Sequence, residues 1–407
     1  MQPKVDPGDT AWLLVSTSLV LLMTPALALF YAGMVQRKNV LSTLMYVLVA
    51  LPIVTVQWTL VGYSLVFGAS HGGLIGGLEH AGLGGLAAGV RGSVPTLAFA
   101  AFQMMFAIIT PALIAGAFAE RMKFSTYVVF VALWSLFVYD PVAHWVWADD
   151  GWLLKQGALD FAGGTVVHAV AGLSALVGAV TLKKRLGYPH HRSVPHNLTM
   201  TVSGAGLLWF GWFGFNAGSA LTSGALASLA LVTTHVAAGA GALSWVAIEW
   251  AHRKKPTAFG VVSGLVAGLV AITPAAGYVS PASALVIGAL VSPLCYVAVV
   301  SKERLGYDDA LDAFGIHGVG GIFGALATGL FADKALNAAG ADGLFHGGGF
   351  AQLGRQALAV GACGAYAAIV TFVILKALSV TMGLRVAESD EREGLDVTQH
   401  GEQGYTL

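Results

Sequence analysis

Apolar residues fill long unbroken stretches of this chain, and short polar connections separate them. Most stretches hold about 20 residues or more, the length that an α-helix needs to cross a lipid bilayer. They do not alternate polar and apolar positions, as the strands of a membrane β-barrel would. We therefore expect an all-α polytopic membrane protein with eleven transmembrane helices, at about residues 10–34, 40–67, 95–118, 124–147, 161–182, 197–217, 224–250, 257–277, 280–300, 312–331 and 353–383.

The first ten predicted helices divide into two halves of five, at about residues 10–182 and 197–331. Because five is odd, the second half enters the membrane from the opposite side, which is the arrangement of an inverted-topology repeat. The working site of such a fold lies where the halves meet. A long final helix completes the transmembrane domain, residues 1–383, and an acidic cytoplasmic tail, residues 384–407, follows it.

Charge is scarce: 10% of the residues are charged, against about 25% in soluble domains. The 21 basic residues balance the 21 acidic ones, so net charge indicates no partner, and no nucleic-acid partner is expected. Basic residues gather in every second connection, for example at Arg121, Arg185 and Arg253. Since basic loops stay in the cytoplasm, the N-terminus is expected outside and the C-terminus inside. The first apolar run is too long for the h-region of a signal peptide, so no cleavable leader is expected.

Two histidines lie alone in apolar segments: His168, in the fifth predicted helix, and His317, in the tenth. They occupy equivalent places in the two halves. An ionisable side chain at membrane depth is costly, which favours a functional site over a buried histidine that only bonds to the backbone. At 1.5 Å per residue, the two rings would meet only if both helices start below the membrane surface.

Neither histidine has a second metal ligand at helical spacing, so proton transfer and hydrogen bonding are expected rather than metal binding. Cys295 and Cys363 fall in different apolar segments, which indicates free thiols. We therefore expect no metal and no cofactor.

Aromatic residues gather near the predicted outer ends of helices. Trp147 ends the fourth helix, and Trp212, Phe215 and Ser219 lie near the outer end of the sixth. An aromatic face attracts a cation, and a hydroxyl can accept a hydrogen bond from it. The alternative is an ordinary interfacial belt of tryptophans.

Three further residues have both a structural and a functional interpretation. Phe102 and Phe106 are four positions apart and share a helix face, where they either pack or form an aromatic plug. Asp160 precedes the fifth helix. There it would cap the helix, or its charge would stabilise a nearby cation or help to remove the cation's proton, and the structural and functional roles can hold together.

Four motifs together resemble the ammonium transporters of the Amt/Mep/Rh superfamily, specifically the bacterial Amt branch, over nearly the whole chain. They are DFAGGTVVH at 160–168, GWFGFNAGS at 211–219, FGIHG at 314–318 and EREGLD at 391–396. The resemblance implies a homotrimer of eleven-helix protomers in the bacterial inner membrane, with one pore in each protomer.

The resemblance also implies a role for each candidate residue. Substrate would bind outside at Phe102, Trp147 and Ser219, and would then pass a gate formed by Phe106 and Phe215. Beyond the gate, His168, His317 and Trp212 would line the pore. Asp160 would be the electrostatic and structural residue near the binding site. Met104 and Met105 are larger than the residues at these positions in relatives, which leaves the pore width near the gate open. The tail resembles the region that supports the trimer and contacts PII-type signalling proteins.

The expected mechanism follows from the cost of desolvating an ion, which is of order 20 kcal/mol for a bare ion in an apolar medium. Ammonium, or methylammonium as its analogue, would bind outside and lose a proton, and neutral ammonia would pass the histidines. Sodium and potassium have no proton to lose. The alternatives are a channel for neutral gas, as in the Rh branch, a membrane metalloenzyme and an ammonium sensor.

Overall fold

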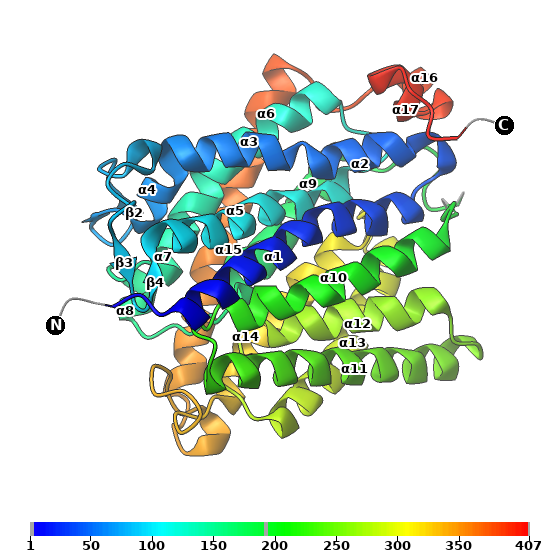
Figure 1. The fold of residues 1–407 in the computed structure, drawn as a ribbon. Helices are drawn as coiled ribbons and strands as arrows, with labels where there is room; N and C mark the ends of the chain where they lie inside the picture. The colour runs from blue at the N-terminus through cyan, green and yellow to red at the C-terminus, as the bar shows by residue number, and fades with distance from the viewer. Residues whose placement is uncertain (1–3, 191–193, 406–407) are drawn as a thin grey trace.

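The computed structural model describes residues 4–190 and 194–405. Long helices lie side by side across the molecule, and the two chain ends lie at opposite ends of the bundle (Figure 1). Within the described residues, ten helices are long and apolar enough to cross a membrane, which confirms a helical polytopic membrane protein. They are Pro7–Met34, Arg37–Phe67, Thr96–Phe118, Phe124–Lys155, Gly164–Leu182, Leu198–Gly218, Ala225–Arg253, Pro281–Leu305, Phe314–Phe331 and Ala351–Thr381.

Several of these spans are built from shorter elements, because π-helical turns interrupt them. The uninterrupted helices are α1 (Pro7–Met34), α5 (Thr96–Phe118), α10 (Leu198–Gly218), α11 (Ala225–Arg253), α13 (Pro281–Leu305) and α15 (Ala351–Thr381). The second span comprises η1 (Arg37–Asn39), α2 (Val40–Leu48), α3 (Ala50–Gln57), η2 (Trp58–Gly62) and α4 (Tyr63–Phe67). The fourth span comprises α6 (Phe124–Trp134), η4 (Ser135–Tyr139), α7 (Asp140–Trp147) and α8 (Trp152–Lys155). The fifth and ninth spans each open with a π-helical turn, as η5 (Gly164–Ala169) with α9 (Val170–Leu182), and η6 (Phe314–Gly318) with α14 (Val319–Phe331).

The stretch predicted to span at 257–277 is shorter than expected. Its helix, α12 (Ala258–Ile272), has 15 residues, which corresponds to about 22 Å, below the roughly 30 Å of a bilayer core. The chain turns beyond it, where Pro274 has no backbone N–H to continue a helix. Helix α12 is nevertheless almost wholly buried and packs against α11 and α13. Counting α12 as an eleventh crossing helix is therefore a proposal.

The glycine-rich connection at 68–94, which lies between the second and third spans, is not helical throughout. This connection forms two small antiparallel hairpins and a 3-10 turn: β1 (Ser70–His71) with β2 (Ile75–Gly76), η3 (Ala81–Leu83), and β3 (Val90–Arg91) with β4 (Val94–Pro95). Gly73 and Gly92 occupy the hairpin turns with φ of 79° and 60°, a conformation that glycine adopts without strain.

The first helices of the two predicted halves pack along each other, α1 against α10. Helices α5 and α9 pack together in the first half, and α11 and α12 in the second. The close approach of α11 to α12 depends on glycine, because a Cβ on Gly268 would lie 2.2 Å from the carbonyl oxygen of Ala237. Such small residues let membrane helices pack closely.

The segment after α15 is folded back on the bundle rather than extended. A 3-10 turn, η7 (Leu344–His346), precedes α15, and α16 (Glu388–Glu393) and α17 (Leu395–His400) follow it. The Asp396 carboxylate accepts hydrogen bonds from the backbone N–H groups of Leu41 and Ser42, at 3.0 and 2.8 Å. The tail therefore packs against the start of α2, at one end of the bundle (Figure 1).

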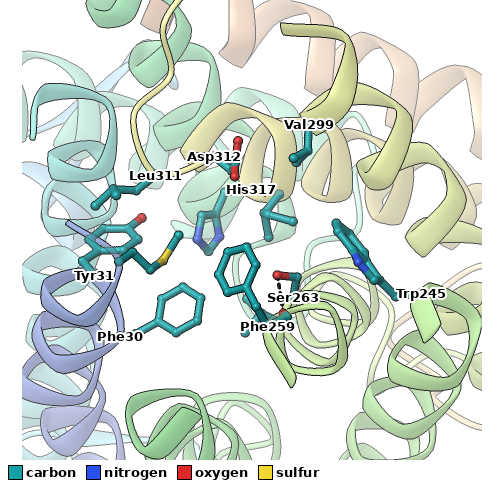
Figure 2. A pocket seen from close by; sticks show the side chains of 12 residues that line it. Phe30, Tyr31, Trp245, Phe259, Ser263, Val299, Leu311, Asp312 and His317 are labelled. Atoms are coloured by element: carbon teal, nitrogen blue, oxygen red, sulfur yellow. Dashed lines mark hydrogen bonds between the residues drawn. The ribbon is translucent and has the colours of Figure 1, made fainter. Parts of the chain in front are cut away.

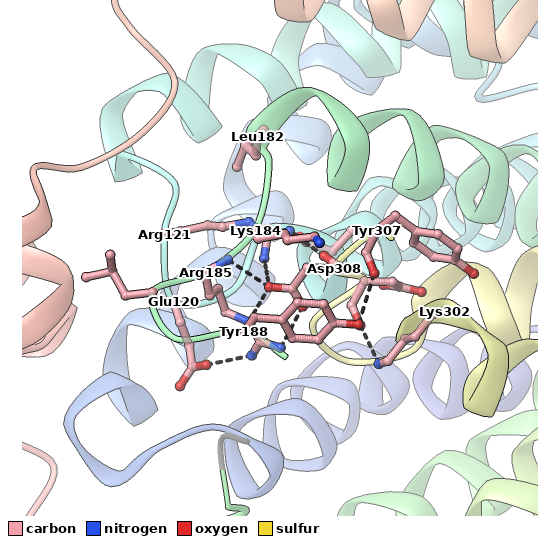
Figure 3. Close-up of polar contacts among 12 residues, drawn as sticks. Glu120, Arg121, Leu182, Lys184, Arg185, Tyr188, Lys302, Tyr307 and Asp308 are labelled. Atoms are coloured by element: carbon pink, nitrogen blue, oxygen red, sulfur yellow. Dashed lines mark hydrogen bonds and ion pairs between the residues drawn. The ribbon is translucent and has the colours of Figure 1, made fainter. Parts of the chain in front are cut away.

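Buried ion pairs hold the same end of the bundle together (Figure 3). Asp308 accepts from the Arg121 guanidinium at 2.9 Å and from Arg185 at 2.8 Å, and Arg185 also contacts Glu120 at 2.7 Å. Burial alone would raise the pKa of Asp308, but the hydrogen bonds and charge of Arg185, with the charge of Arg121, outweigh burial and lower this pKa below its usual range. These contacts join the loop after α9 to the segment that leads into η6.

We predict that Asp308→Asn destabilises the protein by about 3–5 kcal/mol, because it leaves the buried Arg121 charge without its partner. Since the pKa of Asp308 is lowered in the folded protein, its stabilisation is present at neutral pH and declines as the pH falls. Thermal unfolding in detergent at neutral and acidic pH measures both effects. The control is Asp149→Asn, which removes a largely exposed carboxylate and should leave the melting temperature nearly unchanged. Equal melting of the two variants would contradict the prediction.

Candidate functional site

The two intramembrane histidines lie face to face. The ring centroids of His168 and His317 are 5.3 Å apart, with an angle of 18° between the ring planes. Both side chains are buried, 2% and 4% exposed. The rings meet because each helix starts only a few residues before its histidine, at Gly164 and Phe314. The structure thus brings together the pair that the sequence placed in equivalent halves.

An aspartate makes each of these helix starts possible. The Asp160 carboxylate accepts four backbone N–H groups, from Gly163, Gly164, Thr165 and Val166, at 2.7–3.0 Å. These are the groups that a helix start leaves without an intrahelical partner. Burial raises the pKa of Asp160 to about 6, against the lowering effect of these hydrogen bonds. The helix-capping interpretation therefore matches the hydrogen bonds.

Asp309 caps the start of the second histidine-bearing helix, at Phe314, in a similar way. Its carboxylate accepts from the N–H groups of Ala313 and Phe314 at 3.1 and 2.8 Å. Burial raises the pKa of Asp309 to about 6 as well. In each half the capping aspartate lies eight residues before the histidine, since Asp160 precedes His168 and Asp309 precedes His317. The two halves therefore build their site segments in the same way.

Glycines let the two histidine-bearing helices touch. A Cβ on Gly172 would lie 2.1 Å from the backbone nitrogen of Gly318, and a Cβ on Gly321 would lie 2.6 Å from the nitrogen of Ala169. Any side chain at Gly172 would push the helices apart. The ring separation therefore depends on backbone contact at this crossing.

Aromatic rings lie on one side of the histidine pair. Phe106 stacks on Phe215 with centroids 4.3 Å apart, and Phe102 meets Phe106 edge-on at 5.0 Å. Trp147 lies perpendicular to Phe106 at 5.8 Å, and its indole N–H donates to the Asp160 carbonyl oxygen at 3.0 Å. The capping segment thus also orients the tryptophan.

Two further predicted site residues are Trp212, in α10, and Ser219, directly after the end of α10. The Ser219 hydroxyl donates to the Phe215 carbonyl oxygen at 2.8 Å, which leaves its oxygen lone pairs able to accept a hydrogen bond. Trp212 stacks on His168 at 5.4 Å, and its indole N–H donates to the Thr273 hydroxyl at 2.9 Å. Thr273 was not predicted, since nothing in the sequence pattern separates it from other buried threonines.

The imidazoles keep most of their hydrogen-bonding capacity free of protein partners. Both ring nitrogens of His168, and Nδ1 of His317, are buried without a hydrogen bond to the described residues. A neutral imidazole offers one donor and one acceptor. The pair can therefore donate to and accept from a small polar molecule that passes between apolar walls.

Two cavities meet at the histidine pair. One cavity is lined by Met23, Leu27, Phe30, Ile109, Leu113, Val167, His168, Leu208, Trp212, Phe215, Val266 and His317. Among the described residues that line it, none is acidic. The other cavity, shown in Figure 2, is lined by Phe30, Tyr31, Met34, Trp245, Phe259, Ser263, Val266, Val299, Leu311, Asp312, Ile316 and His317. Phe30, Val266 and His317 line both cavities, so the two adjoin, and together we call them the apolar path.

Phe30, Phe259 and Ser263 line this path and were missed from the sequence. Their residue types are also those of ordinary helix packing, so only their place beside His317 identifies them (Figure 2). In the part of the chain that the structure describes, no group of three His, Cys, Asp or Glu side chains could hold a metal ion. Cys295 and Cys363 are free and buried.

The fold and these cavities define a multi-pass membrane protein with a buried, largely apolar path among its helices. The family model named Ammonium Transporter Family matches residues 11–405. The chain belongs to this family, and it is a transport protein rather than an enzyme.

Known relatives resemble the chain over nearly its full length. An ammonium transporter of Bacillus subtilis is 50% identical over 402 residues, which cover 98% of this chain and 98% of the relative. Ammonium transporter Amt1 of Archaeoglobus fulgidus is 45% identical over 99% of this chain and all of the relative. The crystal structure of Candida albicans Mep2 has a TM-score of 0.89 and 36% identity, and covers 95% of this chain and 88% of the Mep2 chain. A structure described as a Sensor Amt Protein has a TM-score of 0.89 and 31% identity, with 97% and 98% coverage.

We predict that Gly172→Ala separates the two histidine-bearing helices, because its methyl group would overlap the backbone of Gly318. Overpacking of this kind costs about 1–3 kcal/mol, and here no flexible side chain can move away. We expect a lower melting temperature and strongly reduced methylammonium uptake in proteoliposomes. Gly361→Ala is the matched control, since its Cβ would meet open space on α15. Normal uptake by Gly172→Ala would be inconsistent with a tight crossing.

Proposed function

We propose that this protein binds ammonium at its outer face, removes one proton, and conducts neutral ammonia along the apolar path past His168 and His317. The observation that carries this proposal is the stacked pair of buried imidazoles at the junction of two largely apolar cavities. A bare cation would lose its hydration there, and Asp312, the one acidic residue among the described residues that line these cavities, is already paired with Lys302. The cost is several kcal/mol even after relaxation. A neutral molecule of the same size avoids most of this cost.

Ammonium is recruited by Trp147, Phe102 and Ser219. The aromatic rings attract the cation through their faces, and the Ser219 oxygen accepts a hydrogen bond from it. This proposal is supported by the edge-on contact of Trp147 with Phe106, since Phe106 is itself stacked on Phe215. That stacked pair is the gate, because its rings must separate before anything passes inward.

Asp160 acts in this proposal through position and charge. Its carboxylate oxygens are occupied by four backbone N–H groups, so it does not bind ammonium directly. It holds Trp147 through its carbonyl oxygen and contributes a negative charge near the outer site. Trp212 supports the His168 ring from the pore wall, and its bond to Thr273 keeps it in place.

We also propose the arrangement in the membrane. Residues 1–383 form eleven crossing helices in two inverted halves, about 10–182 and 197–331, with the N-terminus outside and the tail in the cytoplasm. The equal aspartate-to-histidine spacing in the two halves and the packing of α1 against α10 support the repeat. The protein is proposed to be a homotrimer surrounded by lipid in the bacterial inner membrane, with a PII-type protein as a candidate partner of the cytoplasmic face.

We predict that the double variant His168→Ala with His317→Ala abolishes selective ammonium uptake without unfolding the protein, since both rings lie in the path rather than in a bonded network. Uptake of labelled methylammonium into proteoliposomes measures the effect. His235→Ala is the control, because that ring is exposed and stacks on Trp209 instead of lining either cavity. Normal, selective uptake by a folded double variant would refute the role of the pair.

A second prediction separates ammonium recruitment from passage of neutral gas. At a fixed ammonium concentration, raising the external pH increases the concentration of ammonia. We expect saturable uptake that follows the ammonium concentration, and a raised half-saturation concentration in Trp147→Leu, which keeps an apolar side chain but loses the aromatic face. Uptake that rises in proportion to ammonia, with no effect of Trp147→Leu, would instead favour a channel for neutral gas.

A further inference from the structure

A largely buried stretch of irregular backbone leads into the first histidine-bearing helix. Residues 156–163 lie between α8 and η5 and are neither helix nor strand. The backbone N–H and C=O groups of such a segment lack helical partners, and irregular backbone within a membrane is tolerated only where other parts of the protein satisfy these groups. The partners of this segment therefore fix the position of Asp160, which caps η5 and holds Trp147 through its carbonyl oxygen.

Two glutamines on α15 bond to the part of this segment that precedes Asp160. The Gln356 side chain accepts from the Leu159 N–H and donates to the Leu159 carbonyl oxygen, both at 2.7 Å. Gln352, one turn earlier on the same helix face, donates to the Gly157 carbonyl oxygen at 2.9 Å. Both glutamines are 1% exposed. Because burying an amide is costly unless it forms hydrogen bonds, we attribute the retention of these two side chains to the backbone that they hold.

Gln356 uses the whole hydrogen-bonding capacity of its side chain. An amide side chain has two N–H donors and an oxygen that can accept twice. Besides the two bonds to Leu159, its nitrogen donates to the Ala325 carbonyl oxygen at 3.0 Å, and its oxygen accepts from the other glutamine at 3.3 Å. Ala325 lies in α14, the helix that continues from His317. One side chain on α15 therefore ties the backbone beside Asp160 to the second histidine-bearing helix.

We infer that Gln356 is a positioning residue for the outer ammonium site. It holds both backbone groups of Leu159, so that the next residue, Asp160, presents its carbonyl oxygen to Trp147 and its carboxylate to the start of η5. Gln356 lines neither cavity of the apolar path, so it acts through Asp160 rather than on the substrate. This inference rests on the proposed function, since it assigns Gln356 to the recruitment of ammonium at Trp147.

A second buried polar residue on α15 provides the matched control. Thr371 is fully buried, and its hydroxyl donates to the Ser174 hydroxyl on α9 and accepts from the Trp134 indole N–H, both at 2.9 Å. It lies about 22 Å along the helix from Gln356, at 1.5 Å per residue. Thr371→Val keeps a side chain of similar shape and removes two buried hydrogen bonds of α15. A glutamine with a purely structural role would resemble Thr371 in its effects.

The experiment measures uptake of labelled methylammonium into proteoliposomes, together with thermal unfolding. Gln356→Met keeps an unbranched side chain of similar length and loses the amide. We expect it to raise the half-saturation concentration about tenfold, because small displacements of positioned groups have large effects. Thr371→Val should lower the melting temperature and leave the half-saturation concentration unchanged. Combining Gln356→Met with Trp147→Leu should give no higher half-saturation concentration than Trp147→Leu alone, since both changes act on the same tryptophan.

The inference is overturned if Gln356→Met has the half-saturation concentration of the unmodified protein, if Thr371→Val raises it equally, or if the two effects multiply in the double variant. Should Gln356→Met fail to fold, Gln356→Glu takes its place with the same expectations, because it keeps the acceptor for the Leu159 N–H and loses the amide donors. A normal half-saturation concentration in Trp147→Leu would refute the proposed outer site and this inference together. A raised value in Trp147→Leu beside a normal value in Gln356→Met would refute the inference alone.

Discussion

The site depends on two helices that begin inside the protein rather than at its surface. A helix start exposes backbone N–H groups that cannot remain unpaired in an apolar interior. Asp160 and Asp309 accept these groups, which allows Gly164 and Phe314 to begin helices at depth. Without these two caps the histidines would lie at different heights, and the backbone crossing at Gly172 would not place their rings in contact.

In the proposed function, the same arrangement makes the passage suited to a neutral molecule. The imidazoles can exchange hydrogen bonds with a passing molecule, whereas the surrounding apolar walls provide little to replace the hydration of a cation. Under this proposal, selectivity follows from chemistry rather than from size, since only an ion that can lose a proton becomes neutral. The stacked pair of Phe106 and Phe215 would serve to keep bulk water away from the histidines on its side.

Much of the fold could be predicted because the length and apolarity of a helix that crosses a bilayer are physical requirements visible in any window of the chain. The exceptions have local causes. Pro274 and the turn around it shorten α12, and glycine turns produce small hairpins at 68–94 that no hydrophobic pattern signals. The fold of the tail onto α2 depends on Asp396 reaching Leu41 and Ser42, a contact between distant parts of the chain.

For the candidate site, too, some residues could be predicted from the sequence and others could not. His168 and His317 stood out because a lone ionisable residue at membrane depth is rare, whereas their contact could not be predicted, since it depends on where distant aspartates start the helices. Thr273, Phe30 and Phe259 were invisible because apolar walls and helix packing use the same residue types. Tertiary structure alone distinguishes a residue that faces a passage from one that faces a neighbour.

The most direct test of the central claim compares ammonium and potassium permeation through the unmodified protein in the same proteoliposomes. The account predicts saturable ammonium permeation and no measurable permeation of potassium, which has a similar charge and size but no proton to release. Permeation of potassium at a rate comparable to that of ammonium would show that a bare cation crosses the histidine pair, and would contradict the account.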